Sequence, residues 1–224
     1  LNSKVFEGSI NYSAALTISD GINSATSEYV ELYAGVSEDS SDKVEEPIIP
    51  DNPVDPETPE LPDDGKIIYY TTSDSAPVEL AASTGFGGIL LSNEYDTEAN
   101  IGKLTFSATV TCIPANAFKK STIRTITIPD TVTEIGNEAF YESKIWKITI
   151  GENVKKLGRN IFLGCDSLTY VDINCSCGIS EQCFKECTFL RTVIIGNNVT
   201  SIGTIAFSQC ICLSKLTIGN SVQH

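Results

Sequence analysis

Eight cysteines and one histidine are the residues of this chain that are best suited to metal binding or nucleophilic chemistry. A structural zinc site needs convergent cysteines with C-x₂₋₄-C spacing or histidines, and the only histidine, His224, is the last residue. The acidic stretch 37–64 also lacks the spacing of a calcium-binding EF-hand loop. We therefore expect no metal site.

Catalytic constellations are absent from the sequence pattern. A terminal histidine offers no credible general base for a Ser-His-Asp or Cys-His arrangement. The glycine-rich segment 85–88 lacks both the Lys-Ser/Thr of a P-loop and the spacing of a dinucleotide fingerprint. We expect no catalytic residues, no cofactor and no enzymatic activity.

A repeat of 22 or 23 residues organises the chain from residue 101 onward, and its phenylalanines set the period. One unit reads ITIPDTVTEIGNEAF and the next reads ITIGENVKKLGRNIF. This period is typical of a leucine-rich-repeat solenoid, in which each unit buries its apolar side against its neighbours. The five phenylalanines are Phe118, Phe140, Phe162, Phe184 and Phe207.

Each unit contains an LxxLxL run whose last part alternates apolar and polar residues, which predicts a short half-buried strand. Stacked strands form a parallel sheet on one face. The Ala-Phe pairs, such as Ala139 with Phe140, favour a helical turn on the opposite face. The prediction is an α/β repeat, a leucine-rich-repeat solenoid with parallel strands on one face and short helical turns on the other, preceded by a small β-rich N-terminal part.

The cysteines fit this repeat as packing residues. Cys165, Cys187 and Cys210 each lie three residues after a repeat phenylalanine, where other units have Ser121 and Ser143. Buried free cysteine behaves as a small hydrophobic residue, so we predict a ladder of unpaired thiols, with Cys183 in an alanine position. The redox state of three further cysteines stays open: Cys175, Cys177 and Cys212.

The polar positions of the strands predict a binding face. Side chains that flank the middle apolar residue of each strand point away from the core and line up from coil to coil. Trp, Tyr and Arg dominate the energetics of interfaces. Trp146 faces outward or folds over a neighbouring turn, and the sequence allows both. The candidate binding face consists of Arg124, Trp146, Lys147, Tyr170, Arg191 and Ile194.

The pattern LxxIxIPxxVxxIGxxAFxxCxx resembles the BspA-like leucine-rich repeats of bacterial surface proteins. The similarity begins near Lys66, because segments 67–74 and 85–95 resemble the part that precedes the first repeat in this family. The resemblance implies an extracellular or cell-surface location and a role as a binding or adhesion module for a protein or glycan on host or neighbouring cells. The alternative is a structural scaffold or spacer.

Charge and composition divide the chain. Residues 1–100 contain twenty acidic and three basic side chains, whereas residues 101–224 contain nine and twelve. Without a strong basic patch, nucleic acid is not an expected partner. We predict a β-rich segment at 1–36 with a turn at 20–27, an acidic Pro-rich linker at 37–64, a solenoid cap at 65–100 and repeats at 101–224.

The two ends of the sequence add two expectations. No apolar run is long enough to span a membrane, no signal peptide opens the chain, and methionine is absent, which favours a mature or trimmed fragment. The last repeat is incomplete, so we expect its apolar column of Leu213, Leu216 and Ile218 to be partly uncovered. An uncovered column would allow self-association through this end.

Overall fold

The computed structural model describes residues 4–7, 17–19, 24–26 and 64–223, with side chains described for 64–223. The predicted linker 37–64 therefore lies outside the described residues except for Asp64. The strands are β1 (Lys4–Glu7), β2 (Thr17–Ser19), β3 (Ser24–Thr26), β4 (Ile67–Thr72), β5 (Leu90–Asp96), β6 (Ile101–Phe106), β7 (Cys112–Ile113), β8 (Ile123–Ile126), β9 (Glu134–Ile135), β10 (Lys147–Ile150), β11 (Lys156–Leu157), β12 (Tyr170–Ile173), β13 (Thr192–Ile195) and β14 (Lys215–Ile218).

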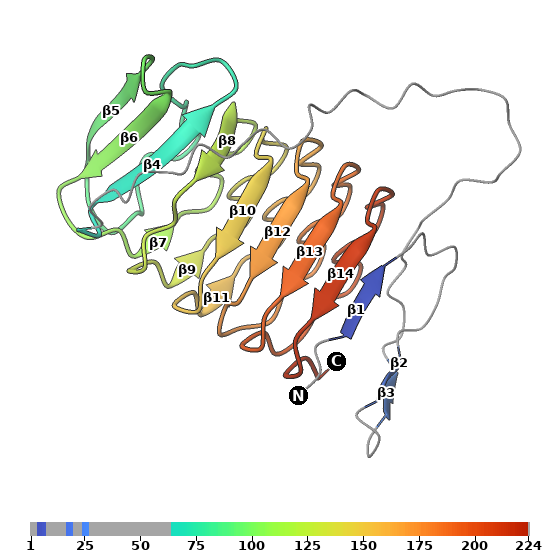
Figure 1. Cartoon of the computed structure of the whole chain (residues 1–224). Helices are drawn as coiled ribbons and strands as arrows, with labels where there is room; N and C mark the ends of the chain where they lie inside the picture. The colour runs from blue at the N-terminus through green and yellow to red at the C-terminus, as the bar shows by residue number, and fades with distance from the viewer. Residues whose placement is uncertain (1–3, 8–16, 20–23, 27–63, 224) are drawn as a thin grey trace, which may run out of the picture.

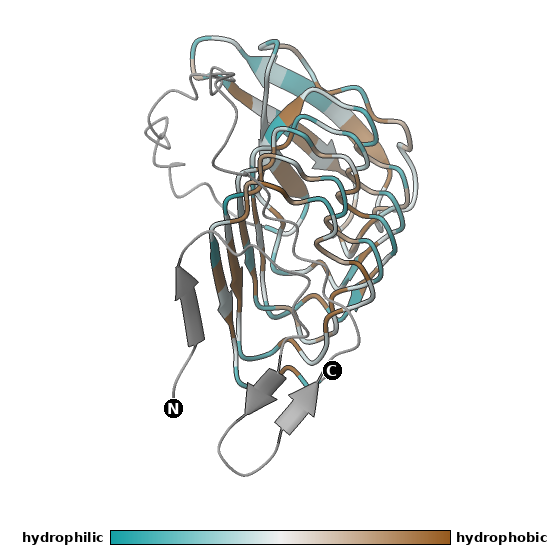
Figure 2. Cartoon of the chain, turned by 90° about the vertical axis from the view of Figure 1, so that its right-hand side faces the viewer, coloured by the Kyte–Doolittle hydropathy of each residue, from teal (hydrophilic) through white to brown (hydrophobic). Residues whose placement is uncertain are grey.

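The predicted parallel sheet is confirmed. Strands β10, β12, β13 and β14 pair in parallel, each with the same residues of the repeat opposite one another. In Figure 1 they run side by side as successive coils of a solenoid, and Figure 2 shows the sheet on one side with the stacked turns on the other. A second parallel ladder joins β7, β9 and β11 on the return path of the coil.

The prediction of helical turns is wrong, because the described residues contain no helix. In each coil the residues two before and two after the phenylalanine have positive φ, for example Glu138 at 56° and Glu142 at 51° around Phe140. An α-helix needs negative φ at every residue, so these left-handed residues exclude one. Asn160 and Gly164 occupy the same two places in the next coil.

The left-handed residues direct alternate backbone N–H groups toward the next coil. The N–H groups of Glu138, Phe140 and Glu142 donate to carbonyl groups one coil further on, each at 2.9 Å, while the N–H of Tyr141 donates within its own turn. The same arrangement recurs at Phe162 and at Phe184. The turns are therefore hydrogen-bonded from coil to coil, as the strands are.

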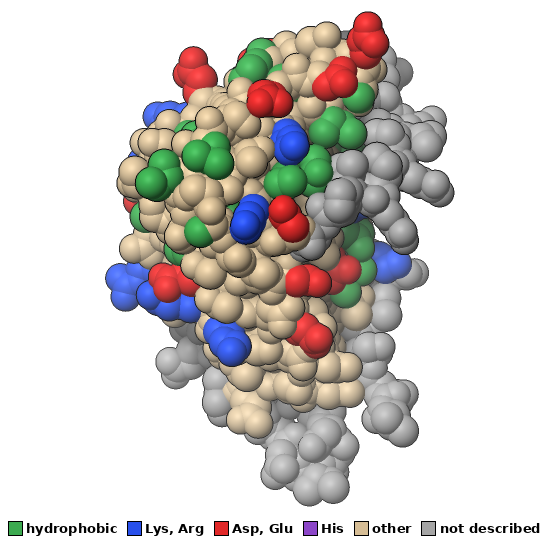
Figure 3. Space-filling view, turned by 90° about the vertical axis from the view of Figure 1, so that its left-hand side faces the viewer, with side chains coloured by type: hydrophobic (Ala, Val, Ile, Leu, Met, Phe, Trp, Pro, Cys, Tyr) green, Lys and Arg blue, Asp and Glu red, His purple; other side chains and the backbone are tan. Residues whose placement is uncertain are grey.

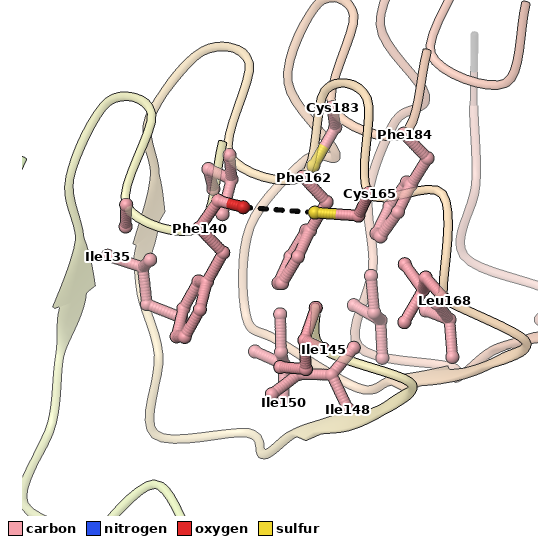
Figure 4. Close-up of a cluster of buried hydrophobic side chains, with 14 of the residues drawn as sticks. Ile135, Phe140, Ile145, Ile148, Ile150, Phe162, Cys165, Leu168, Cys183 and Phe184 are labelled. Atoms are coloured by element: carbon pink, nitrogen blue, oxygen red, sulfur yellow. Dashed lines mark hydrogen bonds between the residues drawn. The ribbon is translucent and has the colours of Figure 1, made fainter. Parts of the chain in front are cut away.

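The phenylalanine column fills the space between the sheet and the turns. The rings of Phe118, Phe140, Phe162, Phe184 and Phe207 stack with centroid separations of 5.1–5.3 Å and interplanar angles of 12° or less. All are buried, and Figure 4 shows three of them above the aliphatic residues of the strands. The three inner rings, those of Phe140, Phe162 and Phe184, are each covered by a ring of the coil on either side.

The cysteine prediction is confirmed: Cys165, Cys187 and Cys210 are buried and unpaired. The sequence did not predict their hydrogen bonds. The Cys165 thiol donates to the Phe140 carbonyl of the preceding coil at 2.9 Å (Figure 4), and Cys187 does the same to Phe162 at 3.1 Å. Burial raises the pKa of Cys165 to about 12, so this thiol stays protonated and remains a donor.

The N-terminal end of the solenoid is closed by an inserted strand. Strand β4 lies between β6 and β8 and is antiparallel to both, and β5 pairs with β6 at the edge of this sheet. The segments 67–74 and 85–95, which precede the first repeat, contain β4 and most of β5. Strands from both sides of the predicted boundary at 100/101 share this sheet, so the division into domains stays a prediction.

The other end of the parallel sheet is covered by the N-terminal segment. Strand β1 pairs with β14 in antiparallel orientation, with Lys4 opposite Ile218 and Glu7 opposite Lys215. Leu216 and Ile218 are 7% and 6% exposed, so the expectation is wrong for these two residues, whereas Leu213 of the same column is half-buried and partly uncovered as expected. Strands β2 and β3 form a hairpin, in which β3 occupies part of the turn predicted at 20–27. The last part of the predicted β-rich segment, residues 27–36, lies outside the described residues.

The left-handed turn positions generate a stability prediction. Replacing Asn160 by Ile should lower the free energy of unfolding by about 1–2 kcal/mol, because a β-branched residue resists positive φ. Asn160→Gly is the matched control and should retain stability, since glycine adopts this φ readily. Urea unfolding followed by circular dichroism measures both. Equal losses in the two variants would contradict the left-handed turn.

Close packing in the cap generates a second stability prediction. A Cβ at Gly102 would overlap the buried Tyr70 ring. The hydroxyl of Tyr70 fixes this ring, because it donates a hydrogen bond to the Asn93 side chain and accepts one from the Val78 N–H at 3.2 Å. Gly102→Ala should therefore cost about 1–3 kcal/mol of unfolding free energy. Gly151 has no atom within 4 Å of the corresponding position, so Gly151→Ala should change stability by less than about 0.5 kcal/mol. Similar effects of the two substitutions on thermal unfolding would disprove the packing.

Candidate functional site

Two rows of outward side chains cross the parallel sheet. Inward residues such as Ile148 and Ile150 are buried, and the alternate residues on each strand face away from them. One row is Lys147, Tyr170, Thr192 and Lys215, and the other is Thr149, Asp172, Ile194 and Thr217. The predicted residues Lys147, Tyr170 and Ile194 therefore belong to one surface.

A third row lies just before the strands and is joined by backbone hydrogen bonds. The Trp146 N–H donates to the Arg124 carbonyl at 3.0 Å, and the Thr169 N–H donates to the Trp146 carbonyl at 2.9 Å. Arg191 follows through its own N–H bond to Thr169 at 3.0 Å. The structure thus places Arg124, Trp146, Thr169 and Arg191 in four successive coils of one ladder, beside the first row of strand residues. We call the surface formed by Arg124, Trp146, Lys147, Tyr170, Arg191 and Ile194 the strand face.

The residues of the strand face differ in exposure. Arg124 and Arg191 are exposed, whereas Trp146, Lys147, Tyr170 and Ile194 are half-buried. Trp146 is thus neither fully outward nor fully folded away, and part of its surface remains open to a partner. The structure brings all six predicted residues to one surface, and their role in binding stays a prediction.

Lys147, Tyr170 and Asp172 form a small electrostatic group at the centre of the strand face. The Lys147 Nζ lies 5.7 Å from the centre of the Tyr170 ring, a cation–π contact. Partial burial raises the pKa of Asp172, and the charge of Lys147 opposes that effect. Burial and the charge of Asp172 together raise the pKa of Tyr170. Asp172 was not among the predicted site residues, although the strand alternation places it there.

The basic residues of the strand face and those of the turn side differ in whether they form ion pairs with carboxylates. Five lysines outside the strand face make ion pairs with carboxylates: Lys119 with Glu138, Lys120 with Glu142, Lys144 with Asp166, Lys156 with Glu134, and Lys185 with Glu186. Within residues 64–223, by contrast, no carboxylate forms an ion pair with Arg124, Arg191 or Lys215.

The cap presents exposed apolar residues that the sequence reasoning missed. Ile89 is 74% exposed and Leu91 is 65% exposed, next to and within the edge strand β5. Figure 3, which faces the cap, shows hydrophobic side chains interspersed with charged ones on this side. The alternation of residues in β5 is the signal that could have placed Leu91 outward.

The described residues contain no group of three or more histidine, cysteine, aspartate or glutamate side chains that could hold a metal ion. Across the same residues, no helix is long and apolar enough to cross a membrane.

Comparison with known proteins identifies the repeat. The profile of the BspA type leucine rich repeat region matches residues 92–214 in six copies. The chain belongs to this family. No curated protein matches the BspA-type chain.

Solved structures of bacterial leucine-rich repeat proteins are similar to part of the BspA-type chain. A Bacteroides ovatus leucine-rich repeat protein is 28% identical, with 50% of this chain and 30% of that chain covered and a TM-score of 0.45. One from Eubacterium ventriosum is 24% identical, with 49% and 30% covered and a TM-score of 0.47. A leucine rich cell surface protein from Faecalibacterium prausnitzii is 22% identical, with 50% and 40% covered and a TM-score of 0.33. The aligned part is less than half the length of each of these chains.

The raised pKa of Asp172 generates a pH prediction. In the unfolded chain this carboxyl ionises near its ordinary pKa of 3.8, and in the folded chain it ionises at higher pH. The folded state therefore loses stability as the pH rises from below 3.8 through the folded pKa. At pH 7, Asp172→Asn should raise the melting temperature slightly. The gain in the free energy of unfolding should be less than about 1 kcal/mol, because the group is partly exposed, and it should vanish below pH 3.8.

Asp166, which is paired with Lys144, supplies the control for this measurement. Asp166→Asn should bring no such gain at pH 7, because it removes an ion pair. A lower melting temperature of Asp172→Asn at pH 7 would contradict the assigned direction.

Proposed function

We propose that this BspA-type chain is a non-catalytic binding module of the bacterial cell surface, which recognises an acidic protein or glycan through the strand face. The observation that carries the proposal is the ladder of Arg124, Trp146, Thr169 and Arg191, whose backbones are hydrogen-bonded from coil to coil. The ladder presents two exposed guanidinium groups and an indole on one rigid surface.

The composition of the strand face supports an acidic partner. Arginine and tryptophan contribute most to interface energetics, and arginine binds carboxylate or sulfate groups through two parallel hydrogen bonds. Arg124 and Arg191 have no carboxylate partner within residues 64–223, and Lys215 extends the positive charge along the sheet. Half-buried Trp146 and Tyr170 supply flat apolar surface for a sugar ring or an aliphatic side chain.

The family supports the proposed surface location. BspA-like repeats are typical of bacterial surface proteins, which bind host matrix or other cells, and the repeats cover most of residues 92–214 here. The non-catalytic assignment is supported by the same family.

The alternative is a scaffold that self-associates through its last repeat. Such association would use the edge of β14 that is opposite β13. In this chain that edge is already paired with strand β1, Lys4–Glu7. The binding module is therefore the function that the geometry favours.

Tryptophan fluorescence provides a direct test, because Trp146 is the only tryptophan. The protein is titrated with poly-glutamate, an acidic polysaccharide such as polygalacturonate, and a panel of matrix proteins. We expect a saturable change in emission with at least one acidic ligand, and weaker binding at higher ionic strength.

Arg191→Ala and Arg124→Ala should each weaken this binding about tenfold while leaving the fluorescent reporter in place. Arg159→Ala removes an exposed positive charge from the turn side and is the matched control. Equal losses in Arg159→Ala and Arg191→Ala, or an absence of saturable binding across the panel, would contradict the proposal.

A further inference from the structure

Cys175 and Cys177 form a pair of thiols in direct contact. The Cys177 Sγ donates a hydrogen bond to the Cys175 Sγ at 2.7 Å, and the Cys175 Sγ lies 3.5 Å from the Cys177 carbonyl oxygen. Across residues 64–223 this is the only hydrogen bond that joins two sulfur atoms. The pair follows strand β12, in the turn where the third repeat departs from the others.

A deletion in the repeat produces this contact. Phe184 follows Ile173 by eleven residues, whereas Phe162 follows Ile150 by twelve, so the third coil makes the same turn with one residue fewer. Cys175 is fully buried in this shortened turn, and Ser176 is exposed. The chain bends sharply at residues 176–177, which directs both thiols to the same side of the backbone.

The neighbouring coils hold the bend in place on both sides. The Ser176 N–H donates to the Val154 carbonyl at 2.9 Å, and its hydroxyl donates to the Glu152 carbonyl at 2.8 Å. On the other side, the Cys177 carbonyl accepts the N–H of Thr200 at 3.2 Å. The two thiols are thus positioned before any reaction takes place.

This pair differs from the structural thiols of the solenoid. Cys165 and Cys187 are buried, each donates to a backbone carbonyl, and burial raises the pKa of both thiols. Cys177 is only half-buried, so a small reagent can reach it. The hydrogen bond between the two thiols lowers the pKa of Cys175 and raises the pKa of Cys177, so Cys175 loses its proton first and more readily than an isolated buried thiol does.

We propose that Cys175 and Cys177 are a dithiol site that small external disulfides oxidise to an intramolecular disulfide. After the pair has lost one proton, transfer of the shared proton to Cys175 leaves Cys177 as the thiolate. Its sulfur attacks one sulfur of the external disulfide, the S–S bond breaks, and the first external thiolate leaves.

The second step closes the ring. Cys175, deprotonated by solvent, attacks the Cys177 Sγ, the mixed disulfide breaks and the second external thiolate leaves. The two cysteines are oxidised by two electrons, the external disulfide is reduced to two thiols, and these thiols take up the two protons. The product links residues 175 and 177 and is reversed by excess dithiol.

The test uses the full chain with the other half-buried cysteines removed, as Cys112→Ser and Cys212→Ser. This variant is incubated with glutathione disulfide, quenched with acid and measured by intact mass and by titration of free thiols. We expect the loss of two hydrogens and of two thiols per chain, a peptide map that joins residues 175 and 177, and full reversal by dithiothreitol.

Matched controls carry Cys177→Ser or, separately, Cys177→Ala on the same background, and circular dichroism verifies that they are folded. Neither should lose two hydrogens. A stable glutathione adduct on Cys177, no change in mass, or a disulfide between other cysteines would overturn the proposal.

Discussion

The hydrogen bonds that join each turn to the turn of the next coil are the constraint on which the rest of the structure depends. Left-handed residues such as Glu138 and Glu142 direct the N–H groups on either side of Phe140 along the solenoid axis. Because the turns and the strands are bonded in the same direction, each coil is fixed against its neighbours on both sides. The phenylalanine rings then stack at about the spacing of the strands, with separations of 5.1–5.3 Å.

The same constraint positions the strand face. Its residues come from different coils, so their alignment depends on the register between coils and not on local sequence. Backbone bonds from Arg124 to Trp146, and onward to Arg191 through Thr169, transmit that register to the side chains. A one-residue deletion in the third coil leaves the strands and phenylalanines aligned, and its effect is confined to the turn that holds Cys175 and Cys177.

Periodicity predicts what recurs in the sequence and nothing else. The inward strand residues, the phenylalanine column and the buried cysteines recur at a fixed spacing, and the structure has them as predicted. The prediction for the turns was wrong because an Ala-Phe pair also suits a helix. Positive φ is usually indicated by glycine, whereas here glutamate, glutamine and isoleucine occupy left-handed positions. The insertion of β4 between β6 and β8, and the pairing of β1 with β14, are single events that a repeat pattern does not encode.

Hydrogen exchange of the turn amides, measured by NMR on the whole chain, tests the coil-to-coil bonding most directly. The amides of Glu138, Phe140 and Glu142 donate to the next coil, and those of Asn160, Phe162 and Gly164 do the same one repeat later. We predict that these six amides are protected from exchange as strongly as the amides of strand residues 148 and 171. If the six amides exchanged at the rate of exposed loops and only the strands were protected, the turns would not be hydrogen-bonded between coils and this constraint would not exist.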